Sequence, residues 1–498
     1  MLPFKTLIKL DRTARCPLYI QIASTIIRQI TAGTIPVGLK LPGGRKLAEL
    51  LGVSRRTAML AYEELEAQGW IEIKPNQGTF IHTNIPIIHK QNLPIGVLNE
   101  AHQQSHFGLN QQLDFLAYYQ APNLKDIQYV FDTGYPDVRL APLKELSQNM
   151  GSVLMSKRDK KIMNYAANFN GHRQLRTEIV KYLAESRGIN TSVDNLIITR
   201  GSLMAFSNIF RVLLAPKDKV IVGDVSFKVA KDIIQIAGGE LVTVPVDEQG
   251  MDIDAIEKAC QMQTIRAVFV MPHHHHPTTV SLTAARRVKL LQLAEKYHFA
   301  IVEDDYDYDF HYASSPILPM ASSDRAGSVI YVGSLSKIVA PGLRLGFIIA
   351  PVDFINDLSR LSRFLDCHGN TAMEKAIALL FKDGIIRRHL KKSLKIYRQR
   401  RDLFCNLLQK EIGQFIQFSI PEGGLAVWVL FDKKIRLKKL RIVCSKNGVL
   451  ISKSIFQDKK GQNLNAIRMG FASLNENELI KGVELLKMSI LEILTENF

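Results

Sequence analysis

Apolar runs of strand length alternate with helical patterns from about residue 126 onward. Examples of these runs are NLIIT, KVIVG, ELVTVPV, RAVFVMP, FAIVEDD and SVIYVGS, and a helical pattern follows each of them. Strands that alternate with helices form βαβ units, in which the strands lie parallel in one sheet. The pattern predicts an α/β domain with a mostly parallel central sheet over residues 126–498.

A chain of 498 residues is longer than one hydrophobic core usually serves, so we expect more than one domain. Residues 1–83 show short helical patterns and a glycine turn. Residues 84–125 are rich in Gln, Asn and His, which is typical of a linker. We therefore expect a small N-terminal domain over 1–83, a linker over 84–125 and the α/β domain over 126–498.

The N-terminal region has the pattern of a winged helix-turn-helix. The segment 45–51 is a short helical pattern that Gly52 ends, and Ser54 is a good N-cap for a second helix that extends to about Gln68. The segments WIEIK and TFIH, joined by a PNQG turn, predict a β-hairpin, the wing. The same pattern also fits a plain helical hairpin with a solvated basic edge, and the wing favours the winged helix.

The start of that second helix carries the groups that read DNA. In a helix-turn-helix the second helix enters the major groove N-terminus first. Arginine is the commonest reader of guanine, and hydroxyl groups bind phosphates. The candidate DNA-binding residues at this end are Ser54, Arg55, Arg56 and Thr57.

The segment VGSLSKIVAPGLRLG, residues 332–346, suits a phosphate-bearing aldehyde. Lys337 can form a Schiff base once burial or a nearby positive charge lowers the pKa of its amine. Hydroxyl groups before it and Arg344 after it can hold a phosphate. These are the needs of pyridoxal 5'-phosphate (PLP), which also requires a carboxylate at its ring nitrogen. FAIVEDDYDYDF supplies carboxylates at the end of a strand. Each segment alone also fits a solvated turn, a surface loop or a metal site.

Two family resemblances follow from these segments. PLYIQIA, LPGGRKLAELLGVSRRT, AYEELEAQGW and NQGTFI resemble the DNA-binding domain of the GntR family of bacterial regulators. That resemblance implies DNA contacts from Arg45, Arg55 and Thr57, less strongly from Arg56, with the wing turn at Gly78 near the minor groove. The family often has a basic residue where this chain has Met59.

The second resemblance covers residues 131–485 and is to fold-type I aminotransferases. It rests on FDTGYPDVRLAP, NYAANFNGHRQLRTEIVKYLAESRGI, TRGSLMA, IVEDDYDYDF, VGSLSKIVAPGLRLGFIIAP and IRMGFA. With the N-terminal region, the chain resembles the MocR-type subgroup of GntR regulators. The resemblance implies that Lys337 forms the Schiff base, Asp304 pairs with the ring nitrogen and Tyr306 bonds the ring hydroxyl. The implied phosphate ligands are Ser334, Ser336, Arg344, Gly201 and Ser202.

The same resemblance implies three further contacts and a homodimer. Phe227 would stack on the cofactor ring, Tyr165 would reach the phosphate from the other subunit, and Arg468 would grip a substrate carboxylate. Fold-type I sites are built at a subunit interface, so we expect two copies of the chain to pair.

The chain departs from the aminotransferase pattern at several positions. MPHHHHPTTV has Thr279 at a usual glycine and His276 before the proline. Four consecutive histidines suggest a metal site, but side chains alternate along an extended segment, so we expect no metal and His274 or His276 near the cofactor. Leu203 and Ala141 replace a frequent Gln and a frequent aromatic residue, which leaves substrate and transaminase efficiency open.

Charge and composition favour an anionic partner. The net charge is +17, of which residues 1–83 contribute 11 Lys and Arg against 6 Asp and Glu. The run RRHLKKSLKIYRQRRDLF, residues 387–404, is either a second DNA surface or a solvated helix face. The resemblance favours the solvated face, because basic helices are usual at this place in the family. Five scattered cysteines, no apolar run of transmembrane length and no signal-peptide pattern in MLPFKTLIKLDR predict a cytoplasmic protein.

These observations predict a PLP-dependent transcription regulator that binds double-stranded DNA. Its effector would be sensed through PLP at Lys337, and would be PLP itself or a small amino acid or amine. The alternatives are a working aminotransferase with an appended DNA-binding domain, and a DNA-binding protein whose large domain only dimerises.

Overall fold

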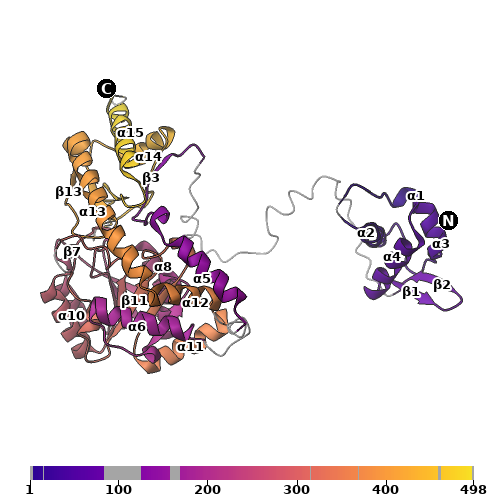
Figure 1. Ribbon diagram of the computed structural model, residues 1–498, viewed down its shortest axis with the longest axis horizontal. Coiled ribbons are helices and arrows are strands. Elements are labelled where there is room, and N and C mark those ends of the chain that lie inside the picture. Colours follow the sequence, from indigo (N-terminus) through magenta and orange to yellow (C-terminus); the bar gives the residue numbers. More distant parts are fainter. Residues whose placement is uncertain are drawn as a thin grey trace. The chain divides into compact units, whose positions relative to one another are not determined.

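The computed structural model describes residues 4–14, 16–83, 125–157, 169–313, 316–367, 369–457 and 461–495. The chain divides into two compact units, Met1–Pro122 and Asn123–Phe498 (Figure 1). Of the predicted linker, 84–125, residue 125 is described and residues 84–124 lie outside the described residues.

Unit 1 is a winged helix-turn-helix. Its elements are α1 (Phe4–Leu7), α2 (Leu18–Thr31), α3 (Gly44–Leu51), α4 (Arg55–Ala67), β1 (Ile71–Lys74) and β2 (Gly78–Ile81). Gly52 ends α3 in the left-handed conformation, at φ 63°, and lets the chain turn directly into α4. Strands β1 and β2 pair antiparallel with Ile71 opposite Ile81, and both of these side chains are buried in the core. The predicted winged helix is confirmed.

The core of unit 1 follows the helical periodicity read from the sequence. Ala58, Ala61, Tyr62 and Leu65 of α4 are buried, at the spacing of one helix face. They pack with Ile22, Ile26 and Ile30 of α2 and with Leu47 of α3. The buried Tyr62 hydroxyl donates to the Pro42 carbonyl oxygen at 2.6 Å, so its polar end is satisfied inside the core. The opposite face of α4 is left to solvent.

Unit 2 is built on a seven-stranded sheet in the order β4-β12-β11-β10-β9-β5-β6. The strands are β4 (Leu196–Thr199), β5 (Lys219–Gly223), β6 (Glu240–Val244), β9 (Ala267–Val270), β10 (Ala300–Asp305), β11 (Val329–Ser334) and β12 (Gly346–Ile349). Their pairing is parallel except for β12, which is antiparallel to both of its neighbours. The predicted α/β fold with a mostly parallel sheet is confirmed.

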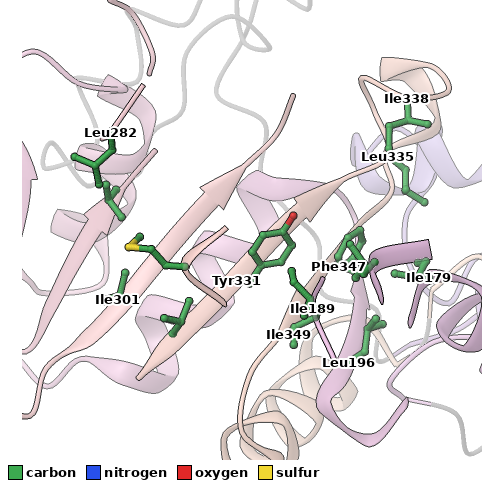
Figure 2. Packing of buried hydrophobic residues seen from close by; sticks show 14 of the residues in the cluster. Ile179, Ile189, Leu196, Leu282, Ile301, Tyr331, Leu335, Ile338, Phe347 and Ile349 are labelled. Atoms are coloured by element: carbon green, nitrogen blue, oxygen red, sulfur yellow. The ribbon is translucent and has the colours of Figure 1, made fainter. Parts of the chain in front are cut away.

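Helices cover both faces of this sheet. They are α5 (Leu143–Met155), α6 (Arg173–Arg187), α7 (Ser202–Leu213), α8 (Lys228–Ile236), α9 (Ile253–Met262), α10 (Ala284–Tyr297), α11 (Val352–Asp366) and α12 (Thr371–Lys382). Side chains of α6, α9, α10 and α12 pack on one face, and those of α7, α8 and α11 pack on the other. Figure 2 shows the first cluster, in which Tyr331 of β11 lies between Ile301 of β10 and Phe347 of β12.

A smaller region completes unit 2. It contains β13 (Ile416–Phe418), β14 (Ala426–Phe431) and β16 (Ala466–Gly470) in an antiparallel sheet, and β15 (Val449–Ile451) paired with β3 (Tyr129–Phe131). The helices here are the long α13 (Ile385–Ile412), α14 (Leu437–Lys446) and α15 (Glu476–Thr495), which share one core with these strands. The short remaining elements are β7 (Val246–Asp247), β8 (Gly250–Met251) and the 3-10 turns at Val138–Leu140, Val193–Asn195, Met320–Ser322, Pro341–Leu343 and Gly413–Phe415.

Candidate functional site

A pocket of about 180 Å³ lies at the carboxyl ends of the parallel strands. This is the edge at which open α/β sheets bind ligands, because the loops that follow the strands diverge there. The predicted residues that line it are Ser202, Phe227, His276, Asp304, Tyr306, Ser334, Ser336, Lys337 and Arg344. They come from segments up to 142 positions apart (202 to 344), which the sheet brings together.

Lys337 follows β11 and projects into this pocket. Its Nζ donates to the Gly134 carbonyl oxygen at 2.6 Å and lies 4.4 Å from the centre of the Tyr135 ring. Burial of the amine, with the Arg468 guanidinium nearby, lowers its pKa from 10.5 to about 8 in spite of the surrounding carboxylates. The unprotonated fraction of the amine near neutral pH is therefore larger than that of an ordinary lysine, which favours a Schiff-base nucleophile.

Asp304, at the end of β10, is a buried carboxyl group with an unused acceptor. Its Oδ1 atom has no hydrogen-bond partner within the described structure. Burial raises its pKa well above the ordinary value, and the neighbouring Asp305 and Asp307 raise it further. A buried acceptor of this kind needs a donor. A protonated pyridine nitrogen supplies that donor, so Asp304 fits the ring of PLP.

Polar groups that suit a phosphate gather at one end of the pocket. Ser336 Oγ is buried and has no hydrogen-bond partner among the described residues. Gly201 caps the N-terminus of α7 at φ 80°, and a Cβ there would lie 2.8 Å from Arg344 Nη2. Arg344 is exposed and donates to the Arg200 carbonyl oxygen at 3.2 Å. A helix N-terminus, a guanidinium and a free hydroxyl together fit a phosphate group.

Aromatic groups and a neutral histidine border the pocket. The Phe227 and His276 rings meet edge to face with centres 5.1 Å apart. Burial and the Arg468 charge lower the pKa of His276 well below its ordinary value, so the imidazole is neutral. Tyr306 OH donates to the His274 carbonyl oxygen at 2.8 Å. Tyr165, the predicted contribution of a second subunit, lies outside the described residues.

Arg468 on β16 is fully buried and does not line the pocket. Its Nε donates to the Thr133 carbonyl oxygen at 3.0 Å, and its Nη1 donates to the Pro277 carbonyl oxygen at 3.1 Å. Its Nη2 donates to the Tyr306 hydroxyl at 3.1 Å. In this arrangement the guanidinium ties β16 to the cofactor pocket, and a carboxylate would have to replace these acceptors to reach it.

The four histidines divide between two roles. His273 Nδ1 hydrogen-bonds Asp305 at 3.0 Å, and His274 Nδ1 hydrogen-bonds Asp307 at 2.9 Å, both inside the protein. Of the two alternatives left open by the sequence, His276 lines the pocket and His274 does not. In the part of the chain that the structure describes, no group of three or more His, Cys, Asp and Glu side chains is arranged to hold a metal ion.

The predicted DNA-binding residues of unit 1 lie mostly at the surface. Arg45, Ser54, Arg55 and Arg56 lie on the surface, and Thr57 is half-buried. Within the described residues, none of these three arginines pairs with a carboxylate. The wing turn ends at Gly78, at φ 118°, where the nearest side chain in the described structure is that of Lys40. The helix start therefore presents unneutralised cations, as a phosphate-binding surface does.

Some residues at both sites were missed in the sequence. Thr133, Tyr135, Met271 and Pro341 also line the pocket, and the centre of the Tyr135 ring lies 4.4 Å from Lys337 Nζ. Lys40 and Lys74 flank the wing, each with its ammonium 5.7 Å from the Phe80 ring. Tyr135 stands in a segment that resembles the aminotransferases and could have been found there. Lys40 could not, because its place beside the wing depends on the pairing of residue 40 with Phe80, 40 positions further along the chain.

We expect Ser54→Ala to lower the free energy of unfolding of unit 1 by about 1 kcal/mol. Ser54 Oγ accepts the Thr57 backbone N–H at 3.1 Å, and alanine removes that N-cap. Ser54→Asp should keep the cap and the stability but weaken DNA binding through charge repulsion. Chemical denaturation and DNA titration of the two variants separate these effects. Equal stability of wild type and Ser54→Ala would contradict the capping role.

Comparison with known proteins agrees with both units. Residues 135–486 match the family model "Aminotransferase class I and II", and residues 18–81 match "Bacterial regulatory proteins, gntR family". Because the first match spans most of the chain, the protein belongs to the aminotransferase class I and II family. Its N-terminal unit is a gntR-family DNA-binding domain.

Relatives with the same two-part architecture are transcription regulators. The uncharacterized HTH-type transcriptional regulator YdfD of Bacillus subtilis is 28% identical over 96% of this chain and 97% of its own. The probable rhizopine catabolism regulatory protein MocR of Rhizobium meliloti is 25% identical over 97% and 96%. The kynurenine aminotransferase of Pyrococcus horikoshii matches 80% of this chain and 98% of its own, with a TM-score of 0.68 and 25% identity.

The chain is therefore a MocR-type, PLP-dependent transcription regulator that binds DNA through its gntR-family domain. No helix among the described residues is long and apolar enough to cross a membrane.

Proposed function

We propose that this regulator changes its affinity for DNA when PLP, or an amino compound that reacts with PLP, occupies the pocket of unit 2. The observation that carries the proposal is that the Lys337 amine and the Asp304 carboxyl, whose Oδ1 has no hydrogen-bond partner in the described structure, line one pocket in a chain that also has a DNA-binding unit. When bound, PLP supplies an aldehyde that condenses with amines. The chain's own residues decide where that chemistry occurs.

Each of these residues has a distinct task in the proposal. Lys337 presents an amine whose lowered pKa leaves it reactive near neutral pH. Asp304 would hold the proton of a bound ring nitrogen, and Arg344 with Ser336 would hold the phosphate. His276, which is neutral, and Phe227 would border the ring without adding charge. An amine effector would compete with the Lys337 amine for the aldehyde, and the two outcomes would define two states of the pocket.

A homodimer is part of the proposal. Leu203 and Met204, in the first turn of α7 beside the pocket, are 36% and 42% exposed. Exposed apolar side chains next to a binding site support a surface that a partner covers. We expect a second copy of the chain to cover it, and sedimentation of the full chain tests this.

The experiment measures DNA affinity of the full chain by fluorescence anisotropy, with and without PLP at fixed salt, on the duplex upstream of its own gene. Coupling between two sites of a protein typically changes affinity about 5- to 150-fold. We expect a change of at least about 5-fold that disappears in Lys337→Ala and persists in Lys258→Ala, an exposed lysine of α9. Affinity that is indifferent to PLP and to amino compounds would rule the proposal out.

A working aminotransferase remains the second candidate, because the reactive Lys337 and the free Asp304 acceptor serve catalysis equally well. Turnover of an amino acid with 2-oxoglutarate, abolished in Lys337→Ala, would establish it. The buried, fully engaged Arg468 favours weak turnover of carboxylate substrates.

A further inference from the structure

Helix α13 carries a row of exposed cations that neither the pocket nor the winged helix uses. Residues 385–401 contain eight Lys and Arg and no Asp or Glu. At about 100° per residue, six of the eight fall within a sector of about 140°. These six are exposed and form what we call the basic face of α13: Arg387, Arg388, Lys391, Lys392, Lys395 and Arg398. In Figure 1, α13 is the long orange helix.

The two sides of α13 differ in their ion pairs. On the inner side, the buried Arg400 pairs with Asp137 at 2.9 Å, and Tyr397 is also buried. On the basic face, Arg387 pairs with Glu185. The remaining five cations have no carboxylate within ion-pair distance in the described ranges of the chain. The inner cation Arg400 is thus structural, whereas five of the six outer cations are unneutralised.

The placement of these cations destabilises helix α13. Like charges repel at i,i+4, as in Arg387 with Lys391 and Lys391 with Lys395. Arg387 and Arg388 also stand at the helix N-terminus, where the macrodipole is positive and acidic residues are favoured. A face that only keeps a helix solvated usually mixes both signs. A polyanion would relieve both repulsions, which is the reason to assign this face a partner.

We propose that the basic face of α13 is a second contact with duplex DNA, beside the sequence that the winged helix binds. The inference rests on the proposed function, because it takes DNA as the partner of the chain. From Arg387 to Arg398 the helix extends about 16 Å. That length matches about five phosphates along one strand. The contact is to the backbone and is independent of base sequence, so it adds affinity without adding specificity.

The test compares two triple variants of the full chain by anisotropy on the same upstream duplex. One is Lys391→Gln, Lys392→Gln, Lys395→Gln. The control is Lys433→Gln, Lys434→Gln, Lys438→Gln, which removes the same charge from exposed lysines just before and at the start of α14. The loss of three phosphate contacts should make the slope of log affinity against log salt less negative by about 2.7. It should also lower the affinity for DNA about 100-fold near 0.15 M salt. The control variant should change the affinity for DNA by no more than about 3-fold and leave the salt slope nearly unchanged.

Equal losses in both variants would show a general charge effect, and no loss in the α13 variant would show a solvated face; either result overturns the contact. Retained PLP binding by the variant shows that unit 2 is folded.

The variant Arg55→Ala separates this contact from the proposed function. If Arg55→Ala and PLP alter DNA binding while the α13 variant does not, this inference alone fails. If neither Arg55→Ala nor PLP has an effect, the proposed function fails. If the α13 variant loses binding to phosphatidylglycerol vesicles but not to DNA, the partner of the basic face is a membrane surface and the DNA contact is overturned.

Discussion

Asp304→Asn is expected to weaken PLP binding by about 30-fold or more. The Asp304 carboxylate would meet the protonated ring nitrogen in a buried pocket, and its Oδ1 has no other hydrogen-bond partner in the described structure. Loss of one member of a buried charged pair costs about 2–5 kcal/mol, and each 1.4 kcal/mol is tenfold in affinity. Titration of the cofactor-free protein with PLP, followed by absorbance, measures the change.

The same substitution should stabilise the cofactor-free protein. The raised pKa of Asp304 means that its ionised form is disfavoured in the fold, so stability falls as pH rises through that raised pKa. Asparagine does not titrate and therefore removes this cost, and we expect a gain of about 1 kcal/mol or more at neutral pH. A loss of PLP affinity together with a gain of stability is a combination that damage to the fold would not produce.

Asp254→Asn is the matched control for this prediction. Asp254 is exposed on α9, pairs with Lys289 at 2.6 Å and does not line the pocket. We expect its PLP affinity to stay within about 3-fold of the wild type, because the lost ion pair is exposed and lies outside the site. Similar PLP affinities for the two variants would remove Asp304 from the cofactor site.

Asp305→Asn is expected to destabilise unit 2 by about 3–5 kcal/mol. Asp305 is fully buried on the other face of β10, where it accepts from the Tyr331 hydroxyl at 2.6 Å and hydrogen-bonds His273 at 3.0 Å. Its Oδ2 also lies 3.6 Å from Arg187 Nε. Asparagine leaves the buried Arg187 with less negative charge around it. Denaturation by urea, followed by circular dichroism, measures the loss.

The pH dependence of stability provides an independent check. Burial alone would raise the pKa of Asp305, but His273, Arg187 and the Tyr331 hydroxyl lower it to about 2, from 3.8. A lowered pKa stabilises the fold above the unfolded value, and this stability is lost as pH falls from about 4 to about 2. Asp305→Asn should flatten the curve in that window. Asp254→Ala removes an exposed ion pair with Lys289 and should leave the unfolding midpoint unchanged. An equal shift in both variants would contradict the structural role of Asp305.

These two predictions share one geometric cause. Successive side chains of a strand point to opposite faces of its sheet. Asp304 therefore faces the pocket and Asp305 faces the core that contains Tyr331. The motif EDDYDYD contains both carboxylates, and the resemblance to aminotransferases distinguishes the first of them. The role of the second depends on Arg187, which lies 118 positions earlier in the chain (187 to 305) and reaches Asp305 through the packing of α6 on the sheet.

The sequence by itself determined the two kinds of unit and much of the cofactor pocket. Strand and helix periods predicted the mostly parallel sheet, and Gly52, Ser54 and the PNQG turn predicted the winged helix. These signals are local, because a helix, a cap or a turn depends on residues a few positions apart. The segment around Lys337 is also a local signal, since its serines, lysine and arginine all lie within eleven consecutive residues (334 to 344).

Only the tertiary structure decided how side chains from distant segments are paired. In the folded protein His273 and His274 hydrogen-bond buried carboxylates, and His276 lines the pocket. Arg468 donates to backbone carbonyl oxygens. The tertiary structure also separated the paired inner cation Arg400 of α13 from the exposed basic face. The physical reason is that charge, burial and hydrogen bonding depend on every group within a few ångströms. Those groups come from segments whose meeting depends on the packing of the whole sheet and its helices.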